Sequence, residues 1–363
     1  MPLTVTVAIF NAPLESFQLD TLRIPALQPQ EILVRNEYVT LCRSDLLTYL
    51  GKRTEKAPTL LGHEIVGRID AMAEDAPQSD LLGQKLKVGD RVTWAIFASD
   101  PKSPMAQAGL PQKADDLFKY GHEAITPESH LHGGLSEYII LRKHTPIIKL
   151  DESIPLPVVT IINCAVATVA GALRLAEDLT GKNVLISGTG MLGIIACAMA
   201  KAKGAANVIA LDINPQRLEL TRQFGADYTL ILPTEPQHLS AVAAEQLGNL
   251  PIHTMIDFSG APDAIENGLD LLAIGGTAIW IGSTYPQRNV QINAEKVVRK
   301  ILTIKGLHNY NSQDLISAVD FIQKHHTVYP FERLVHSGFT LDQVDAAFQY
   351  AIENNPFRVG ITL

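Results

Sequence analysis

The chain has 363 residues, 46% of them hydrophobic, which is enough to bury a large core and indicates two domains. Its formal net charge of -8 argues against a nucleic-acid-binding surface, because such surfaces are basic. With no basic, apolar leader, no apolar run that looks long enough to cross a bilayer and only three cysteines, we expect a cytoplasmic protein with free thiols and no membrane partner.

The first part of the chain is predicted to be rich in β-structure. Alternating polar and apolar side chains predict strands over residues 3–10, 19–24 and 31–39, and a later strand over 138–141. No glycine-rich nucleotide turn accompanies these strands. The chain therefore opens with a β-rich domain and not with a dinucleotide fold.

The pattern changes near residue 183. A short apolar strand over residues 183–186 leads into a Gly-x-Gly-x-x-Gly turn, then into an Ala-rich helix over 191–203 and a second strand over 208–211 that ends at Asp212. A strand, a glycine turn, a helix and a strand with a terminal acid form the arrangement that binds dinucleotides. We therefore predict a nucleotide site here.

Each residue of this turn has a predicted role. Gly188 permits the tight turn, Gly190 lets the backbone approach a pyrophosphate, and Gly193 lets the helix pack closely on the strand. The N–H groups at the start of the helix, around Met191 and Leu192, would bind the phosphates together with the positive end of the helix dipole.

Asp212 is expected to select the cofactor. It lies where a carboxylate would accept hydrogen bonds from the adenosine ribose, and its charge would repel a 2′-phosphate, so NAD is expected and not NADP. Asn214 can cap the helix that follows, in which Arg217 is a further cofactor-binding candidate.

Strands and helices continue to alternate toward the C-terminus. Strands are predicted over residues 228–232, 254–258, 278–281 and 359–363, and helices over residues 264–272, 312–325 and 341–353. Gly275-Gly276 is expected to end the first of these helices. Such alternation implies a doubly wound parallel sheet with helices on both faces, an α/β fold.

Three segments ahead of the nucleotide fold carry a resemblance to a known family. Leu41-Cys-Arg-Ser-Asp45, Leu61-Gly-His-Glu-Ile-Val-Gly67 and Val88-Gly-Asp-Arg-Val92, in this order, resemble the zinc-containing medium-chain alcohol dehydrogenases, and the similarity covers essentially the whole chain. The resemblance implies a GroES-like catalytic domain, residues 1–165 and 307–363, and a Rossmann NAD-binding domain, residues 166–306.

The resemblance also implies a catalytic zinc. Cys42 and His63 match the first two ligands of the family, and Cys164, in Asn163-Cys-Ala-Val-Ala-Thr168, matches the third. Three protein ligands would leave one position of a tetrahedral zinc open for substrate. Cys197, on the helix after the glycine turn, is expected to be a small buried hydrophobic residue.

Further roles follow from the same resemblance. Ser44 matches the hydroxyl that accepts the proton of the alcohol, and Asp45 matches the carboxylate that orients the histidine ligand. Glu64 is either a residue that supports the ligands or an alternative ligand during exchange. Three more residues match cofactor contacts, two at the pyrophosphate and one at the nicotinamide: Arg43, Arg358 and Thr168.

Two departures from the family pattern change the expected chemistry. Many relatives hold a structural zinc with four cysteines, at positions that here are Asp100, Ser103, Ala106 and Ala114, so we expect one zinc per chain and no structural zinc. Leu47 stands where many relatives place a proton-relaying histidine, so the proton must leave by another route. Three further histidines are expected at the surface and not at a metal: His130, His132 and His144.

The substrate is predicted less directly. Segments such as Lys119-Tyr-Gly-His-Glu123 and Gly306-Leu-His-Asn-Tyr310 resemble a subgroup associated with phosphonate catabolism. The alcohol would then carry a phosphonate, with Lys119, His122 and His308 as candidates to bind the anion.

Three alternatives remain open. The first is a polyol or amino-alcohol dehydrogenase of the sorbitol or threonine type. The second is a zinc-free enone or quinone reductase, whose relatives lack the equivalents of Cys42 and His63. The third is a catalytically silent NAD-binding protein. By analogy with relatives that pair the edge strands of their nucleotide domains, a homodimer or homotetramer is expected.

Overall fold

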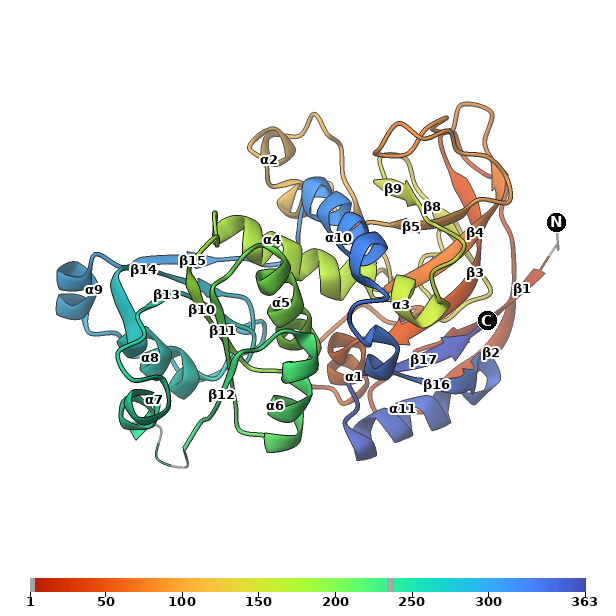
Figure 1. Ribbon diagram of the computed structural model, residues 1–363. Helices are drawn as coiled ribbons and strands as arrows, with labels where there is room; N and C mark the ends of the chain where they lie inside the picture. Colours follow the sequence, from red (N-terminus) through yellow and green to blue (C-terminus); the bar gives the residue numbers. More distant parts are fainter. Residues whose placement is uncertain (1–3, 234, 236–237) are drawn as a thin grey trace. The chain divides into compact units, whose positions relative to one another are not determined.

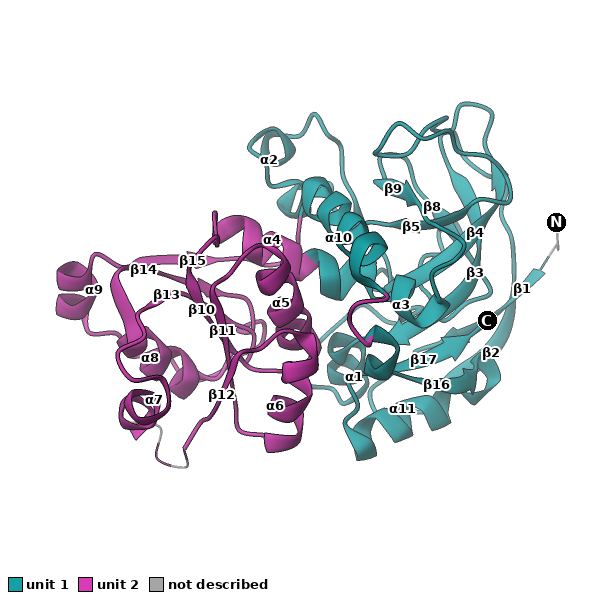
Figure 2. Cartoon of the chain, in the orientation of Figure 1, with its two compact units in different colours: residues 1–167, 311–326, 331–363 teal, residues 168–310, 327–330 magenta. Residues whose placement is uncertain are grey.

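The computed structural model describes residues 4–233, 235 and 238–363. Contacts divide the chain into two compact units (Figure 2): unit 1 comprises residues 1–167, 311–326 and 331–363, and unit 2 comprises residues 168–310 and 327–330. The sequence placed the boundaries after residues 165 and 306. Residues 327–330, predicted in the catalytic domain, group with unit 2 instead, and Leu3 of the first predicted strand lies outside the described residues.

Unit 1 is built on a seven-stranded sheet in the order β16-β17-β3-β4-β5-β9, with β8 also paired to β3 (Figure 1). Its pairs are antiparallel except β16 with β17, as expected for a β-rich domain. The strands of this sheet are β3 (Ile32–Leu41), β4 (Glu64–Met72), β5 (Arg91–Trp94), β8 (Tyr138–Leu141), β9 (Ile147–Lys149), β16 (Val335–Thr340) and β17 (Arg358–Thr362).

The described residues of this unit also form two small sheets and five α-helices. The small sheets pair β1 (Thr4–Ile9) with β2 (Gln18–Arg23) and β6 (Phe97–Ala98) with β7 (Phe118–Lys119). The helices are α1 (Arg43–Tyr49), α2 (Pro104–Gln107), α3 (Leu156–Thr160), α10 (Ser312–His325) and α11 (Val344–Asn354). Residues of β3, β4, β5 and α11 form one buried core around Trp94 and Phe348.

Strand pairing within unit 1 explains how segments far apart in sequence meet. Thr40, near the end of β3, is the register partner of Glu64, the first residue of β4. Leu41 is the partner of Val359 in β17. Residues just after β3, just before β4 and at the start of β17 therefore lie at the same end of these three adjacent strands.

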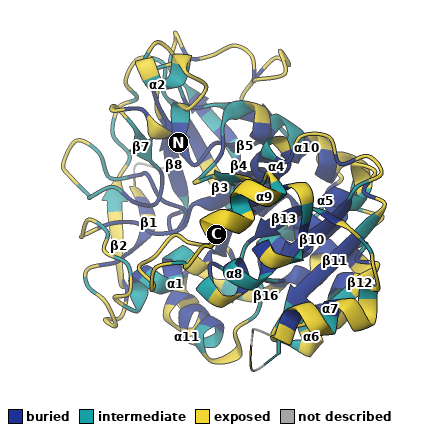
Figure 3. Ribbon diagram, turned by 90° about the vertical axis from the view of Figure 1, so that its left-hand side faces the viewer, coloured by how far each residue is buried: buried dark blue, intermediate teal, exposed yellow. Residues whose placement is uncertain are grey.

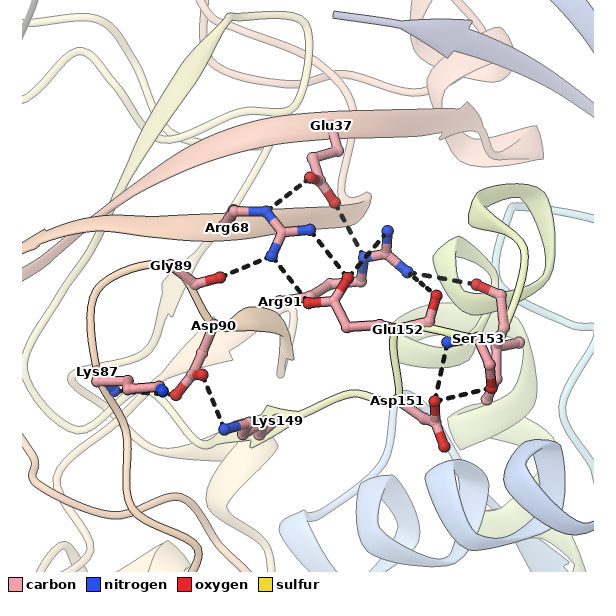
Figure 4. A network of polar contacts seen from close by, with 11 residues as sticks. Glu37, Arg68, Lys87, Gly89, Asp90, Arg91, Lys149, Asp151, Glu152 and Ser153 are labelled. Atoms are coloured by element: carbon pink, nitrogen blue, oxygen red, sulfur yellow. Dashed lines mark hydrogen bonds and ion pairs between the residues drawn. The ribbon is translucent and has the colours of Figure 1, made fainter.

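A network of charged side chains links three strands of the same sheet (Figure 4). Glu37 of β3 accepts hydrogen bonds from Arg68 of β4 and Arg91 of β5, each at 3.0 Å. Arg68 also binds Glu152 at 2.8 and 3.0 Å. Because the two guanidinium groups are held by the same carboxylates, three strands and the segment that leads toward α3 are fixed together.

Unit 2 is built on a six-stranded sheet in the order β12-β11-β10-β13-β14-β15, in which all neighbouring strands are parallel. Strands β10 and β13 are buried (Figure 3). The strands are β10 (Asn183–Ser187), β11 (Asn207–Asp212), β12 (Tyr228–Ile231), β13 (Ile252–Asp257), β14 (Leu272–Trp280) and β15 (Thr303–Gly306). The helices are α4 (Ala167–Leu175), α5 (Met191–Ala202), α6 (Pro215–Thr221), α7 (Leu239–Leu247), α8 (Pro262–Leu271) and α9 (Ala294–Lys300).

Two expectations from the sequence were wrong. Gly275-Gly276 does not end a helix: α8 ends at Leu271 and the glycines lie within β14, with Gly275 at a φ of 75°. The second concerns the expectation that no apolar run is long enough to cross a bilayer. One helical stretch, Leu156–Leu175, is long and apolar enough to do so by length and composition. Most of it (78% of its most apolar part) is buried inside the protein, as in a core helix.

Candidate metal and dinucleotide sites

Unit 1 brings the three predicted metal ligands together. The donor atoms of Cys42, His63 and Cys164 all lie within 4.8 Å of one another. Cys42 directly follows β3 and His63 directly precedes β4, so the register of these strands places them side by side. Among the described residues, no other group of three histidine, cysteine or acidic side chains is close enough to hold a metal.

Cys164 reaches this group from a π-helical turn. The turn, Ile162–Val166, is closed by the Val166 N–H, which donates to the carbonyl of Ile161 over 3.1 Å. Such turns interrupt an α-helix and are frequent at functional sites. Asn163, beside Cys164, donates from its side chain to the carbonyl of His63 at 3.0 Å, which ties the turn to the second ligand.

Asp45 and Ser44 lie close to two of these ligands. The Asp45 carboxylate accepts the N–H of Cys42 at 2.8 Å and that of Gly62 at 3.2 Å, so it fixes the backbone beside two ligands. Its distance to His63 Nδ1 is 3.4 Å, which suits an ion pair better than a hydrogen bond. The Ser44 hydroxyl lies 3.5 Å from His63 Nε2.

Glu64 and Arg358 form a buried ion pair behind the ligands. Arg358 Nε and Nη2 donate to the two carboxylate oxygens of Glu64 at 2.6 and 2.7 Å, and Nη2 also lies 3.6 Å from Cys42 Sγ. Thr40 donates its hydroxyl to the same carboxylate at 2.7 Å. The Arg358 side chain is only 4% exposed, and its Nε and Nη2 groups bind Glu64, while its contact with a pyrophosphate stays a prediction.

The two cysteines shift the pKa values of their thiols in opposite directions. Donation from the Cys164 thiol lowers the pKa of Cys42 well below its usual value, with a further contribution from the positive charge of Arg358, while burial opposes it. The same contact raises the pKa of Cys164. Cysteine thiolates and a histidine imidazole are the donor types that zinc prefers, and three of them fit a catalytic zinc with one open position.

The lobe that carries four cysteines in many relatives has other contacts here. Asp100 accepts the N–H of Lys102 at 2.9 Å, and Ser103 caps α2 by accepting the N–H of Ala106. Ala114 is buried. The lobe is thus held by turns and packing, and the absence of a structural zinc stays a prediction.

A second histidine lies beside the metal ligands. The ring of His122 is 5.1 Å from that of His63, and its Nδ1 is 3.2 Å from Glu55, which also pairs with Arg53. Burial lowers the pKa of His122. Sequence reasoning missed Glu55 and Arg53, because nothing in the local sequence distinguishes them from surface charges.

His132 does not lie at the surface as expected: it is only 2% exposed. Its Nε2 donates to the carbonyl of Ala124 at 3.3 Å, and burial lowers its pKa to about 4. The unfolded chain takes up a proton near pH 6.5, so the folded state loses stability as the pH falls from there toward 4. The full loss from this group would be about 3 kcal/mol.

We expect His132→Gln to weaken this pH dependence. Glutamine can still donate to Ala124 but does not titrate, so the free energy of unfolding should fall less between pH 6.5 and 4 than it does in the wild type. Urea unfolding across this range is the measurement. Equal slopes in the two proteins would show that His132 is not buried in its neutral form.

Unit 2 places the predicted nucleotide residues at the carboxyl end of β10. Gly188 has a φ of 84°, and a side chain there would lie 2.6 Å from the backbone of Ser259. A Cβ at Gly193 would lie 1.9 Å from the carbonyl of Gly188. Gly190 is open, with Arg217 Nη1 the nearest atom at 3.9 Å, so its bare backbone leaves room for a phosphate.

The helix start and Asp212 complete this part of the site. The first helical bond of α5 is donated by Ile194, to Gly190, so the N–H groups of Met191 and Leu192 precede the bonded part of the helix. The Asp212 carboxylate accepts the N–H and hydroxyl of Thr189 at 2.6 and 2.9 Å. Thr189 was missed from the sequence, although its place between two glycines of the turn was the available signal.

The remaining predicted residues lie in different places. Arg43, in unit 1, is an exposed first residue of α1, and Thr168 is a buried residue at the start of unit 2. Of the anion candidates, Lys119 and His122 belong to unit 1. His308 belongs to unit 2, where it lines a cavity of about 680 Å³ with Trp280.

Comparison with known proteins is consistent with this geometry. Residues 28–152 match the alcohol dehydrogenase GroES-like domain, and residues 192–324 match the zinc-binding dehydrogenase family. A probable D-xylulose reductase A of Emericella nidulans is 30% identical over 307 residues, covering 82% of this chain and 80% of that protein. Sorbitol dehydrogenase of Mus musculus is 28% identical, covering 95% and 92%.

A solved structure has the same fold. An alcohol dehydrogenase from Thermotoga maritima superposes with a TM-score of 0.91 at 24% identity, covering 99% of this chain and all of that one. The predicted fold, the enzyme class and the zinc and nicotinamide cofactors typical of that class are thereby confirmed, whereas the role of each site residue stays a prediction. The chain belongs to the zinc-dependent medium-chain alcohol dehydrogenase family.

Proposed function

We propose that Cys42, His63 and Cys164 hold one catalytic zinc per chain and that the enzyme passes hydride between a small alcohol and NAD. The observation that carries this proposal is the convergence of the three donors within 4.8 Å, with the Ser44 hydroxyl 3.5 Å from His63 Nε2. When bound, zinc would supply a Lewis acid for the alcohol oxygen, and NAD would supply the hydride acceptor.

The protein's own residues then orient the substrate and move its proton. The Ser44 hydroxyl accepts the alcohol proton and passes its own onward. Asp45 holds the backbone of Cys42 and the ring of His63 in place, as carboxylates near metal ligands commonly do. Leu47 has no group that can carry a proton, so the route from Ser44 must continue through the cofactor ribose or water.

Zinc removal and NAD preference test this function. Dialysis against a chelator should abolish alcohol-dependent NAD reduction, and added zinc should restore it. Because Asp212 would repel a 2′-phosphate, kcat/KM for NADP should be lower than that for NAD by roughly 100-fold. A chelated enzyme that keeps full activity would overturn the proposal and favour a zinc-free reductase.

We further propose a substrate that carries a phosphonate. Lys119 is half-buried, and burial together with the neighbouring charges of Arg53 and Lys113 lowers its pKa. It forms no ion pair in the part of the chain that the structure describes. A cation in this position, three residues from His122, suits a dianionic group on the substrate.

A kinetic panel tests the substrate. Hydroxyalkylphosphonates should exceed uncharged alcohols of equal length in kcat/KM, and Lys119→Met should remove this advantage while leaving the uncharged alcohols unaffected. The exposed Lys52 offers a matched control, since Lys52→Met should change neither. Equal kcat/KM for charged and uncharged alcohols in the wild type would exclude a phosphonate substrate.

A polyol or amino alcohol is the second candidate substrate. The likeness to sorbitol dehydrogenase supports a polyol, and 29% identity to L-threonine 3-dehydrogenase of Deinococcus deserti, over 80% of each chain, supports an amino alcohol. Sorbitol, xylitol and threonine therefore belong in the same panel, and a preference for one of them would replace the phosphonate proposal.

We also propose a cytoplasmic homodimer or homotetramer. β15 is one of the two edge strands of the unit 2 sheet, and Val298 and Ile301, which precede it in the chain, are large apolar side chains that are more than 70% exposed. An unpaired edge beside exposed apolar residues favours pairing with a second copy. Sedimentation at several concentrations would show the state, and a monomer throughout would contradict the proposal.

A further inference from the structure

Unit 2 contains a buried carboxylate that the proposed mechanism does not use. Asp257 is the last residue of β13, and its partner in the strand register is Ser187, the last residue of β10. β10 and β13 are neighbours in the sheet although two strands, β11 and β12, lie between them in the sequence. The order of the strands reverses at this point, and dinucleotides bind in the crevice that such a reversal opens.

The Asp257 carboxylate is 0% exposed and accepts four hydrogen bonds. Its Oδ1 accepts the hydroxyls of Ser187 at 3.0 Å and Ser259 at 2.6 Å, and the N–H of Ser259 at 3.3 Å. Its Oδ2 accepts the N–H of Gly260 at 2.9 Å. No lysine or arginine pairs with it among the described residues, so the four donors alone stabilise its charge.

The same donors lie in loops that pack backbone against backbone. A Cβ at Gly188, the first glycine of the nucleotide turn, would lie 2.6 Å from the N of Ser259. A Cβ at Gly260 would lie 2.5 Å from the carbonyl of Gly282, which follows β14. The loops after three neighbouring strands therefore meet without side chains between them, and Asp257 anchors the middle loop.

We infer that Asp257 is a positioning residue for the dinucleotide: by binding Ser187, Ser259 and Gly260 it sets the width of the crevice between β10 and β13. The inference rests on the proposed NAD-dependent function. The chemistry of the Asp257 carboxylate also predicts that asparagine cannot take its place. Asparagine has one acceptor oxygen for these donors, so its NH₂ group would face the Gly260 N–H in one orientation of the amide and the three donors on Oδ1 in the other.

The test is NADH binding to Asp257→Asn, measured by fluorescence titration at a temperature well below the melting temperature of the variant. We expect the Kd for NADH to rise about 10-fold, because loops that are displaced by a fraction of an ångström no longer match the cofactor. Ser187→Ala and Ser259→Ala each remove one donor and leave the carboxylate in place. Each should raise the Kd by about 3-fold, and they decide the question if Asp257→Asn does not fold.

A core variant of the same strand separates positioning from stability. Ile256→Ala creates a cavity at a fully buried residue next to Asp257, so it should lower the unfolding midpoint and leave the Kd unchanged. A Kd within 2-fold of the wild type in all three polar variants would overturn the inference. Failure of the proposed function looks different, since the wild type itself would then not bind NADH.

Discussion

Cys42→Ser is expected to remove the zinc and at least 1000-fold of the activity, since a zinc site with only three protein ligands loses its metal when one of them changes to a poor donor. Cys42 is buried, and the Cys164 thiol together with the positive charge of Arg358 lowers its pKa, which favours a thiolate that can bind the metal. Metal analysis of the purified wild type should give about one zinc per chain. The same preparations are then assayed for NAD reduction.

Cys197→Ser is the matched control for this variant. Cys197 is fully buried on α5, and burial raises its pKa to about 12, so it is a neutral thiol remote from ligand chemistry. Its serine variant should keep both zinc and activity, with a small loss of stability. About two zinc ions per wild-type chain would reveal a second site, and full activity in Cys42→Ser without zinc would refute the assigned ligands.

The fold was largely predictable where local signals were strong. The predicted helix 312–325 matches α10, whose start is fixed by Asn311 accepting the N–H of Asp314 at 3.1 Å. The predicted strand 138–141 matches β8. Gly275-Gly276 misled because a glycine pair can end a helix or lie in a strand, and only the pairing of β14 with β13 decides between them.

The ligand set was predictable as a resemblance, but its surroundings were not. The π-helical turn that carries Cys164 depends on a backbone hydrogen bond from Val166 to Ile161, which no local sequence pattern predicts. The pairing of Glu64 with Arg358 joins residues 294 positions apart, through the alignment of β4 and β17 on either side of β3. From the sequence alone, an arginine near the end of a chain is predicted to be a surface charge, because that strand alignment is not known.

Arg358→Leu is expected to destabilise the protein by about 3–5 kcal/mol, because it leaves the buried carboxylate of Glu64 without its cation. Burial already raises the pKa of Glu64, and Arg358 opposes that rise, so the variant should also take up a proton on folding near neutral pH. Urea unfolding measures the loss, which should be smaller at pH 5 than at pH 8.

The double variant Glu64→Gln with Arg358→Leu separates this role from cofactor binding. Removing both charges should recover much of the stability lost in Arg358→Leu, because no unpaired ion remains in the core. If Arg358 instead bound the cofactor pyrophosphate, the single variant would raise the Kd for NADH several-fold with unchanged unfolding, and the second substitution would not rescue it. The bidentate contact with Glu64 makes the loss of stability the expected result, since those donors already have partners within the same unit.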